Sequence, residues 1–127
     1  MNLLLDTNAF LWFSEDNKKL SSTAKSFIED SENICFVSIA SIWEMAIKTS
    51  LNKLKVKIGF KNLLEEIKKN DFDLLNISFE HTLKITDLEF HHRDPFDRIL
   101  IAQSLVEDFK IITSDKIFDK YNIERIW

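Results

Sequence analysis

The sequence predicts an α/β fold, in which a central parallel sheet of about four or five strands is flanked by helices in one domain over residues 1–127. Two observations carry this prediction. Short apolar runs alternate along the chain with segments of helical periodicity, which is typical of parallel strands joined by helices. A length of 127 residues with 45% hydrophobic content also suits one compact domain with a single sizeable core.

Five apolar runs are short enough to be single strands. The first strand is predicted at 3–5, where three leucines precede Asp6, and runs of the same kind follow at 34–37 and 110–113. Two further strands are predicted from "DLLNI" at 73–77 and "IERIW" at 123–127. Buried parallel strands carry such continuous apolar runs, so these segments are expected to form the sheet.

The helices are recognised by their N-caps and periodicity, because the chain has only one glycine and one proline to mark boundaries. Serine or aspartate precedes most of the helical patterns and can accept a hydrogen bond from the first turn. Helices are expected to begin near Thr7 and to span 22–29 behind Ser21 or Ser22, 39–51 behind Ser38, 60–69, 79–88 behind Ser78, and 95–107 behind Asp94.

Composition excludes several classes of protein. The single cysteine, Cys35, cannot form an internal disulfide, and the N-terminus has neither a basic region nor a sustained apolar region of the kind found in signal peptides. No apolar run approaches the roughly 20 residues of a membrane-spanning helix. We therefore expect a cytoplasmic protein with no membrane role.

Positive charge is concentrated in one interval, although the formal net charge is −4. Between Glu44 and Glu65 there is no acid, and this interval contains five lysines: Lys48, Lys53, Lys55, Lys57 and Lys61. Such a segment can bind phosphate groups of a nucleic acid. The alternative is a solvated lysine face without a ligand.

Asp6 ends the first predicted strand. Ligands of parallel sheets gather outside the carboxyl ends of the strands, where helix N-termini also point. The alternative is that Asp6 only caps the helix that begins near Thr7. Asp115 repeats the arrangement, because the apolar strand of "IITSD" also ends close to a carboxylate.

Glu44 is a second candidate, in "SIASIWEMAIK". Helical spacing predicts a buried stripe that includes Ile42 and Trp43, and it places Glu44 at the edge of this stripe. The glutamate could instead be solvated or paired with Lys48 one turn later.

The stretch "HHRDPFDRILIAQ" at 91–103 carries two acids at a helix start. Asp94 is the expected N-cap, Pro95 is the first helical residue, and the helix dipole favours both acids. Capping explains Asp97 less well, because a capping box prefers Glu or Gln at that position. Asp97 is therefore a candidate for chemistry, and Asp94 is either a cap or a nearby supporting acid.

Together, Asp6, Glu44, Asp97 and Asp115 are expected to converge at one edge of the sheet. Clustered carboxylates repel each other and raise each other's pKa, a cost that a bound cation offsets. Oxygen ligands without a Cys or His cluster favour Mg²⁺ or Mn²⁺. Such ions polarise phosphoryl oxygens and activate water, which indicates phosphodiester hydrolysis.

The stretches "LLLDTNAFLW", "SIASIWEMAIK", "HHRDPFDRILIAQ" and "IITSD" resemble the successive motifs of PIN-domain ribonucleases, in particular the VapC-like toxins of toxin–antitoxin pairs. The resemblance covers nearly the whole chain. It implies a metal-dependent endoribonuclease that holds Mg²⁺ or Mn²⁺ through the four acids named above, with Thr7, Asn8 and Ser114 as supporting groups. It also implies a parallel sheet flanked by helices, a homodimer and a cognate antitoxin.

Where related sequences often have glycine after the glutamate helix, this chain has Asn52. Asparagine tolerates the left-handed conformation that ends many helices, so the turn is expected to be kept.

The histidines lack a third ligand at zinc spacing, and His81 is expected on the surface of its helix. Contacts with RNA phosphates by His92, Arg93 or Arg98 are further possibilities.

Two other functions remain open. A phosphatase of the haloacid dehalogenase type also begins with a strand and an aspartate, but its second acid is replaced here by Asn8. A catalytically inactive binding protein of the same fold is the second alternative, since a fold does not imply an activity.

Overall fold

The protein contains one five-stranded parallel sheet, seen in a computed structural model that describes residues 1–127. The strand order is β3-β2-β1-β4-β5. The strands span β1 (Asn2–Leu5), β2 (Ile34–Ser38), β3 (Asp73–Leu75), β4 (Lys110–Ile112) and β5 (Arg125–Ile126). All five predicted strands are therefore confirmed, although β3 and β4 end before the predicted boundaries at 77 and 113, and β5 covers only Arg125–Ile126 of the predicted 123–127.

Six α-helices and two short 3₁₀ helices connect the strands. The α-helices are α1 (Thr7–Ser14), α2 (Ser22–Glu29), α3 (Ile39–Ser50), α4 (Leu63–Lys69), α5 (Phe79–Asp87) and α6 (Pro95–Glu107). The 3₁₀ helices are η1 (Phe60–Asn62) and η2 (Lys116–Lys120). The helix predicted over 60–69 is thus divided, because its first turn is the 3₁₀ helix η1.

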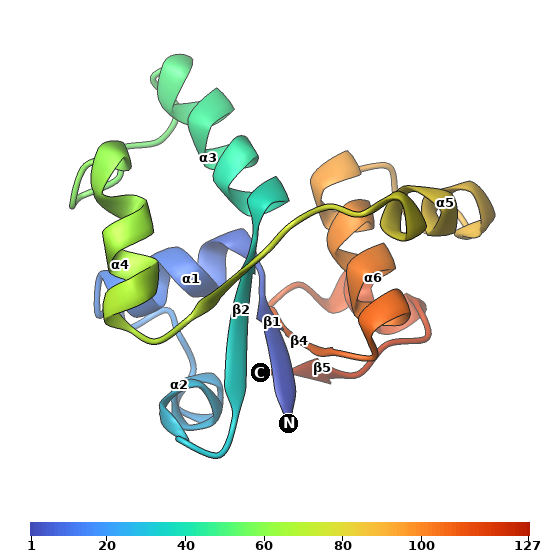
Figure 1. Cartoon of the computed structure of the whole chain (residues 1–127), viewed down its shortest axis with the longest axis horizontal. Helices are drawn as coiled ribbons and strands as arrows, with labels where there is room; N and C mark the ends of the chain where they lie inside the picture. Colours follow the sequence, from blue (N-terminus) through green and yellow to red (C-terminus); the bar gives the residue numbers. More distant parts are fainter.

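Helices cover both faces of the sheet (Figure 1). Successive residues of a strand point to opposite faces, and β1 shows the consequence, since Leu3 and Leu5 belong to one buried cluster and Leu4 to another. The first cluster lies under α1, α2 and α4, and the second lies under α6 and η2. This double burial explains why the central strands are continuously apolar.

Most helix starts use the predicted caps. Ser21, Ser38 and Ser78 each accept a hydrogen bond from the backbone of the first turn of α2, α3 and α5. Asn52 has the left-handed φ of 56°, as predicted. The Lys53 N–H then donates to the Lys48 carbonyl at 2.8 Å, which satisfies an orphan acceptor at the end of α3.

The strand order places a topological switch point between β1 and β4. From β1 the chain proceeds outward to β2 and β3, and then returns to the other side of β1 to form β4 and β5. Crevices outside the carboxyl ends of strands at such a point are the usual ligand sites of open α/β sheets. No helix of the protein has both the length and the apolar character needed to cross a membrane.

Two expectations about side-chain burial are wrong. Trp43 is 60% exposed instead of lying in a buried stripe, because the inward residues of α3 are Ala40, Ser41 and Met45. The indole packs edge to face on Phe96, 5.4 Å between ring centres. His81 is buried instead of exposed, because its imidazole caps α5 and contacts Glu107 of α6 at 3.0 Å.

Candidate active site

The four candidate acids come from four different elements at the carboxyl edge of the sheet. Asp6 follows β1, and Asp115 lies three residues after β4. Glu44 is in the second turn of α3, which begins directly after β2, and Asp97 is in the first turn of α6. Parallel strands end at one edge, and α6 begins there because it precedes β4, so the topology explains why these acids are neighbours.

Asp6 is a buried carboxylate that also caps α1. Its Oδ1 accepts a hydrogen bond from the Ala9 N–H at 2.8 Å. Burial raises the pKa of Asp6 to about 6, and the negative charges of Glu44 and Asp115 act in the same direction. The hydrogen bond from the Ala9 N–H and the neighbouring Thr113 hydroxyl oppose this rise in pKa. The predicted N-cap is therefore present, and capping does not relieve the electrostatic cost of burying this acid.

Glu44 is held by a hydroxyl and an ammonium group. The Thr7 hydroxyl donates to Oε1 at 2.6 Å, and the Lys48 ammonium donates to Oε2 at 2.7 Å. The side chain of Glu44 is only 12% exposed, whereas that of Lys48 is 48% exposed. The structure thus combines two expectations, because Glu44 contacts Thr7 at the acid cluster and also pairs with Lys48 one turn later.

Asp97 is held by a histidine from the segment before α6. The distance from His92 Nε2 to Asp97 Oδ2 is 3.1 Å. Burial raises the pKa of Asp97 to about 6, assisted by the negative charges of Asp94 and Asp115 and opposed by His92. Asp94 itself caps α6, since its Oδ1 accepts from the Phe96 N–H at 2.9 Å and the Asp97 N–H at 3.0 Å. Of the two roles expected for Asp94, the structure shows the cap.

Asp115 is the most exposed of the four acids and caps η2. Its Oδ1 accepts from the Ile117 N–H at 3.0 Å. The Thr113 hydroxyl accepts from the Asp115 N–H at 3.1 Å and also lowers the pKa of Asp6, so Thr113 lies between two acids. Sequence reasoning selected the neighbouring Ser114, which is exposed. The pairing of Leu5 with Ile112 explains why Thr113 and not Ser114 is the neighbour of Asp6, because the next residues of the two strands then lie side by side.

The acids are electrostatic neighbours but do not form a closed ligand cage. The charges of Glu44 and Asp115 repel that of Asp6 and raise its pKa, and the charge of Asp115 does the same to Asp97. No three Asp, Glu, His or Cys side chains lie close enough together to bind one ion in this conformation. An all-carboxylate donor set with two raised pKa values nevertheless fits a hard divalent cation, because positive charge would relieve the repulsion.

Two expected site residues make no direct hydrogen bond to the four acids. The Arg98 side chain is buried, with the residue 4% exposed, and its guanidinium donates to the carbonyls of Glu89 and Leu88 and to the Tyr121 hydroxyl. The expectation that Arg98 contacts RNA is therefore wrong. Asn8 is exposed on α1 and makes no hydrogen bond to the four acids.

Tyr121 is a site residue that sequence reasoning missed. Its hydroxyl lies 2.8 Å from His92 Nδ1, on the opposite side of the imidazole from Asp97. The only available signal was that it is the single tyrosine of the chain. Its approach to His92 depends on the packing of the segment after η2, which has no local signature.

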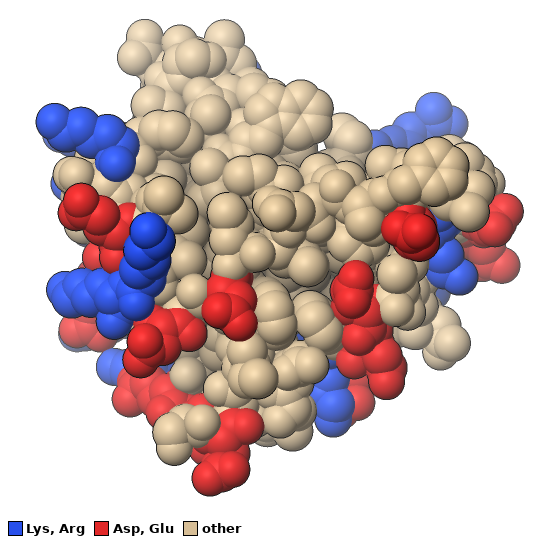
Figure 2. Space-filling view, viewed as in Figure 1, with Lys and Arg blue, Asp and Glu red and all other residues tan.

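The lysines of the acid-free interval lie on the surface. Lys53, Lys55 and Lys57 are exposed in the connection between α3 and η1. On the face shown in Figure 2, lysine and arginine side chains gather mainly at the edge occupied by α4, next to acidic side chains, and they form no continuous patch. Arg93 is also exposed, immediately before the cap of α6.

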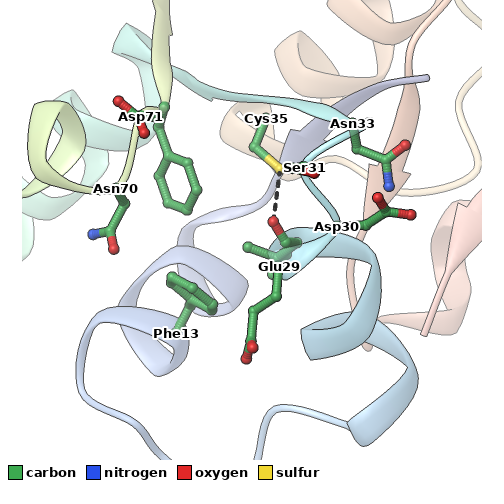
Figure 3. Close-up of a pocket in the computed structure, with 10 residues that line it drawn as sticks. Phe13, Glu29, Asp30, Ser31, Asn33, Cys35, Asn70 and Asp71 are labelled. Carbon is green, nitrogen blue, oxygen red and sulfur yellow. Dashed lines mark hydrogen bonds between the residues drawn. The ribbon is translucent and has the colours of Figure 1, made fainter.

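A separate hollow lies at the opposite edge of the sheet, where β2 and β3 begin. Figure 3 shows that its acids Glu29, Asp30 and Asp71 point in different directions. Its only thiol, Cys35, donates to the Ile28 carbonyl at 3.8 Å, and burial raises the thiol pKa to about 11. Divergent acids and an un-ionised thiol make this hollow a poorer candidate than the carboxyl edge.

Comparisons with known proteins support the parallel α/β fold described above. The family model described as "PIN domain" matches residues 3–124. No curated protein matches the chain.

Solved structures similar to this chain include VapBC2 from Rickettsia felis bound to a promoter DNA fragment, with a TM-score of 0.72, 14% identity and coverage of 98% of this chain and 97% of that chain. DNA-bound VapBC from Salmonella typhimurium has a TM-score of 0.71 at 11% identity, covering 98% and 96%. A toxin–antitoxin complex from Klebsiella pneumoniae has a TM-score of 0.61 at 17% identity, covering 90% and 87%.

Proposed function

The chain belongs to the PIN domain family, and we propose that it is a metal-dependent endoribonuclease, the VapC-like toxin of a toxin–antitoxin pair. The observation that supports this proposal is that four carboxylates from four elements lie at the carboxyl edge of the sheet, where Asp6 is repelled by Glu44 and Asp115, and Asp97 by Asp115. Two of these acids, Asp6 and Asp97, have a pKa raised to about 6 by burial. A fold keeps such a destabilising cluster when a ligand requires it.

The proposed cofactor is Mg²⁺ or Mn²⁺, held by Asp6, Glu44, Asp97 and Asp115. Such an ion, when bound, polarises a phosphoryl oxygen and lowers the pKa of a water molecule. Carboxylate oxygens suit these hard cations, whereas a zinc site would use histidine or cysteine ligands.

The residues around the acids hold them in place before the ion binds. Thr7 fixes one oxygen of Glu44, and Lys48 partly neutralises the other. The Thr113 hydroxyl accepts from the Asp115 backbone N–H and lowers the pKa of Asp6. Groups that are already oriented need little reorganisation when charge develops on a phosphate in the reaction, which favours catalysis.

The proposed substrate is RNA, and exposed cations outside the acid cluster are proposed to contact its phosphates. They are Lys53, Lys55, Lys57 and Arg93. The first three lie together in one connection without an intervening acid. Lysine and arginine bind phosphates through charge, so their contribution should depend on salt.

The proposed partners are a cognate antitoxin and a second copy of the chain in a homodimer, in the cytoplasm. The toxin–antitoxin assignment is supported by the four motifs that resemble VapC-like toxins and by the similar folds of two VapBC structures and one toxin–antitoxin complex. An antitoxin would give the cell control over an otherwise damaging ribonuclease.

Cleavage of RNA by the purified protein tests this function. We expect cleavage with Mg²⁺ or Mn²⁺, none after chelation, and recovery when the ion is restored. Glu44→Gln removes one charged ligand while keeping the shape of the side chain, and it should abolish cleavage. Cleavage that persists in the presence of a chelator, or in Glu44→Gln, would overturn the proposal. A folded wild type without cleavage under any of these conditions would favour the inactive binding protein.

A further inference from the structure

A chain of hydrogen bonds leads from the buried Arg98 to Asp97. The Arg98 guanidinium donates to the Tyr121 hydroxyl at 3.1 Å. That hydroxyl lies 2.8 Å from Nδ1 of His92, and Nε2 of the same imidazole lies 3.1 Å from Asp97 Oδ2. Two segments that are distant in sequence, residues 92–98 and Tyr121, therefore meet in this network, and no part of it is explained by the capping of α6.

The donors around Tyr121 decide how the imidazole is protonated. The phenol oxygen accepts from the Arg98 guanidinium and, at 3.3 Å, from the His91 N–H. Both are pure donors, and a hydroxyl oxygen has two acceptor sites, so its own hydrogen is directed to His92 Nδ1. Because Nδ1 accepts, the proton of the neutral imidazole is on Nε2 and points to Asp97.

We propose that His92 is a positioning residue for Asp97. The His92 imidazole donates its Nε2–H to Oδ2 of this proposed metal-binding acid, and Tyr121 orients the imidazole. The inference rests on the proposed function, because it assumes that Asp97 binds the ion. The donor occupies Oδ2, and Oδ1 is left without a hydrogen bond from the protein.

The packing around His92 keeps the imidazole in this orientation. Its side chain is only 18% exposed and lies beside Phe118 and Tyr121, at 6.3 Å and 5.6 Å between ring centres. A ring confined in this way can orient a carboxylate at little entropic cost when an ion binds. Removing such an outer partner typically weakens metal binding about 10- to 100-fold.

Three substitutions separate this hydrogen bond from simple packing. His92→Phe keeps an aromatic ring but removes both nitrogens, whereas His92→Gln keeps a side-chain N–H that can reach Asp97. His91→Phe is the matched control, because His91 also packs against Tyr121, 4.8 Å between ring centres, but its nitrogen contacts Glu89 at 3.1 Å instead of an acid of the cluster.

The measurement is the dissociation constant for Mn²⁺ of each folded protein, with thermal melts alongside. We expect His92→Phe to bind Mn²⁺ about tenfold or more weakly than the wild type. His92→Gln should recover most of this loss, and His91→Phe should bind like the wild type. A ¹H–¹⁵N spectrum of the wild-type histidines should show His92 in the Nε2–H form.

The outcomes distinguish this inference from the proposed function. A wild type that binds no Mn²⁺, or an Asp97→Asn variant that binds it normally, overturns the metal site and the positioning role together. A wild type that binds Mn²⁺ in an Asp97-dependent way, with His92→Phe binding equally well, overturns the positioning role alone. The Nδ1–H form of His92 in the wild type would also overturn it alone.

Discussion

The Thr7 hydroxyl and Glu44 Oε1 are 2.6 Å apart, which joins the first turn of α1 to the second turn of α3. This contact orients a carboxylate of the candidate site from outside its own helix. It also connects two elements that follow neighbouring strands, β1 and β2. The same hydrogen bond therefore contributes to both stability and the geometry of the site.

Thr7→Val tests this contact, since valine keeps the shape and branching of threonine but has no donor. We expect the free energy of unfolding to fall by about 1.5–3 kcal/mol, the range for a hydrogen bond to a charged group. Mn²⁺ binding should weaken about tenfold, because Glu44 loses its fixed orientation. Denaturant unfolding and Mn²⁺ titration measure the two effects. Thr7→Ser keeps the hydroxyl and is the control, and an equal loss in both variants would show that the hydroxyl is not responsible.

Asp97→Asn should abolish metal-dependent cleavage of RNA, whereas Asp94→Asn should leave most of it. Asparagine at position 94 still caps α6, because it is as good an N-cap as aspartate. Asparagine at position 97 keeps the shape of the side chain but lacks the charged oxygens of a Mg²⁺ or Mn²⁺ ligand. Cleavage rates of the two folded variants provide the comparison. An active Asp97→Asn protein beside an inactive Asp94→Asn protein would reverse the roles of these acids.

Asp6→Asn should stabilise the metal-free protein at pH 7. Burial raises the pKa of Asp6 from 3.8 to about 6, so the charged form destabilises the folded state by about 3 kcal/mol. Asparagine removes this charge and can still cap α1. We expect an equal or higher melting temperature, loss of cleavage, and a smaller rise in melting temperature with Mn²⁺ than in the wild type. A lower melting temperature with an unchanged response to Mn²⁺ would support capping as the sole role of Asp6.

The stability of the metal-free protein should also depend on pH in a defined direction. Asp6 and Asp97 each have a folded-state pKa of about 6 against an ordinary value of 3.8, so the folded protein binds these protons more tightly than the unfolded chain does. Stability from these groups is therefore present at low pH and is lost as the pH rises from about 4 through 6. Unfolding free energies across this range should fall less steeply in Asp6→Asn. If the unfolding free energies of the wild type and Asp6→Asn fell equally over this pH range, the raised pKa of Asp6 would be contradicted.

Replacing Lys53, Lys55 and Lys57 by glutamine should weaken RNA binding and flatten its dependence on salt. These lysines are exposed. Each phosphate contact that is lost reduces the number of counterions released on binding, and the salt dependence follows that number. Binding isotherms at several salt concentrations measure the slope. The control changes three other exposed lysines, Lys18, Lys68 and Lys69, and so alters the net charge equally. If the two triple variants show the same slope, the effect is general electrostatics and the interval is a solvated face.

The elements of the fold could be predicted from the sequence because their signals are local. The three leucines before Asp6 indicate a strand buried on both faces, and Asp94 with Pro95 marks a helix start. Asn52 predicted a left-handed helix end in the same way. Each signal depends on residues within a few positions of one another, so no knowledge of the packing is needed.

The chemistry of the sequence indicated the acids, but only the tertiary structure decided which residues of distant segments contact them. The register of β1 with β4 places Thr113 beside Asp6 in preference to Ser114, and the packing of the last segment brings Tyr121 to His92. Packing also turned Arg98 inward and Trp43 outward, against expectation. Hydrogen-bond partners between distant segments depend on strand register and on how helices pack, and neither is encoded in the spacing of residues along one segment.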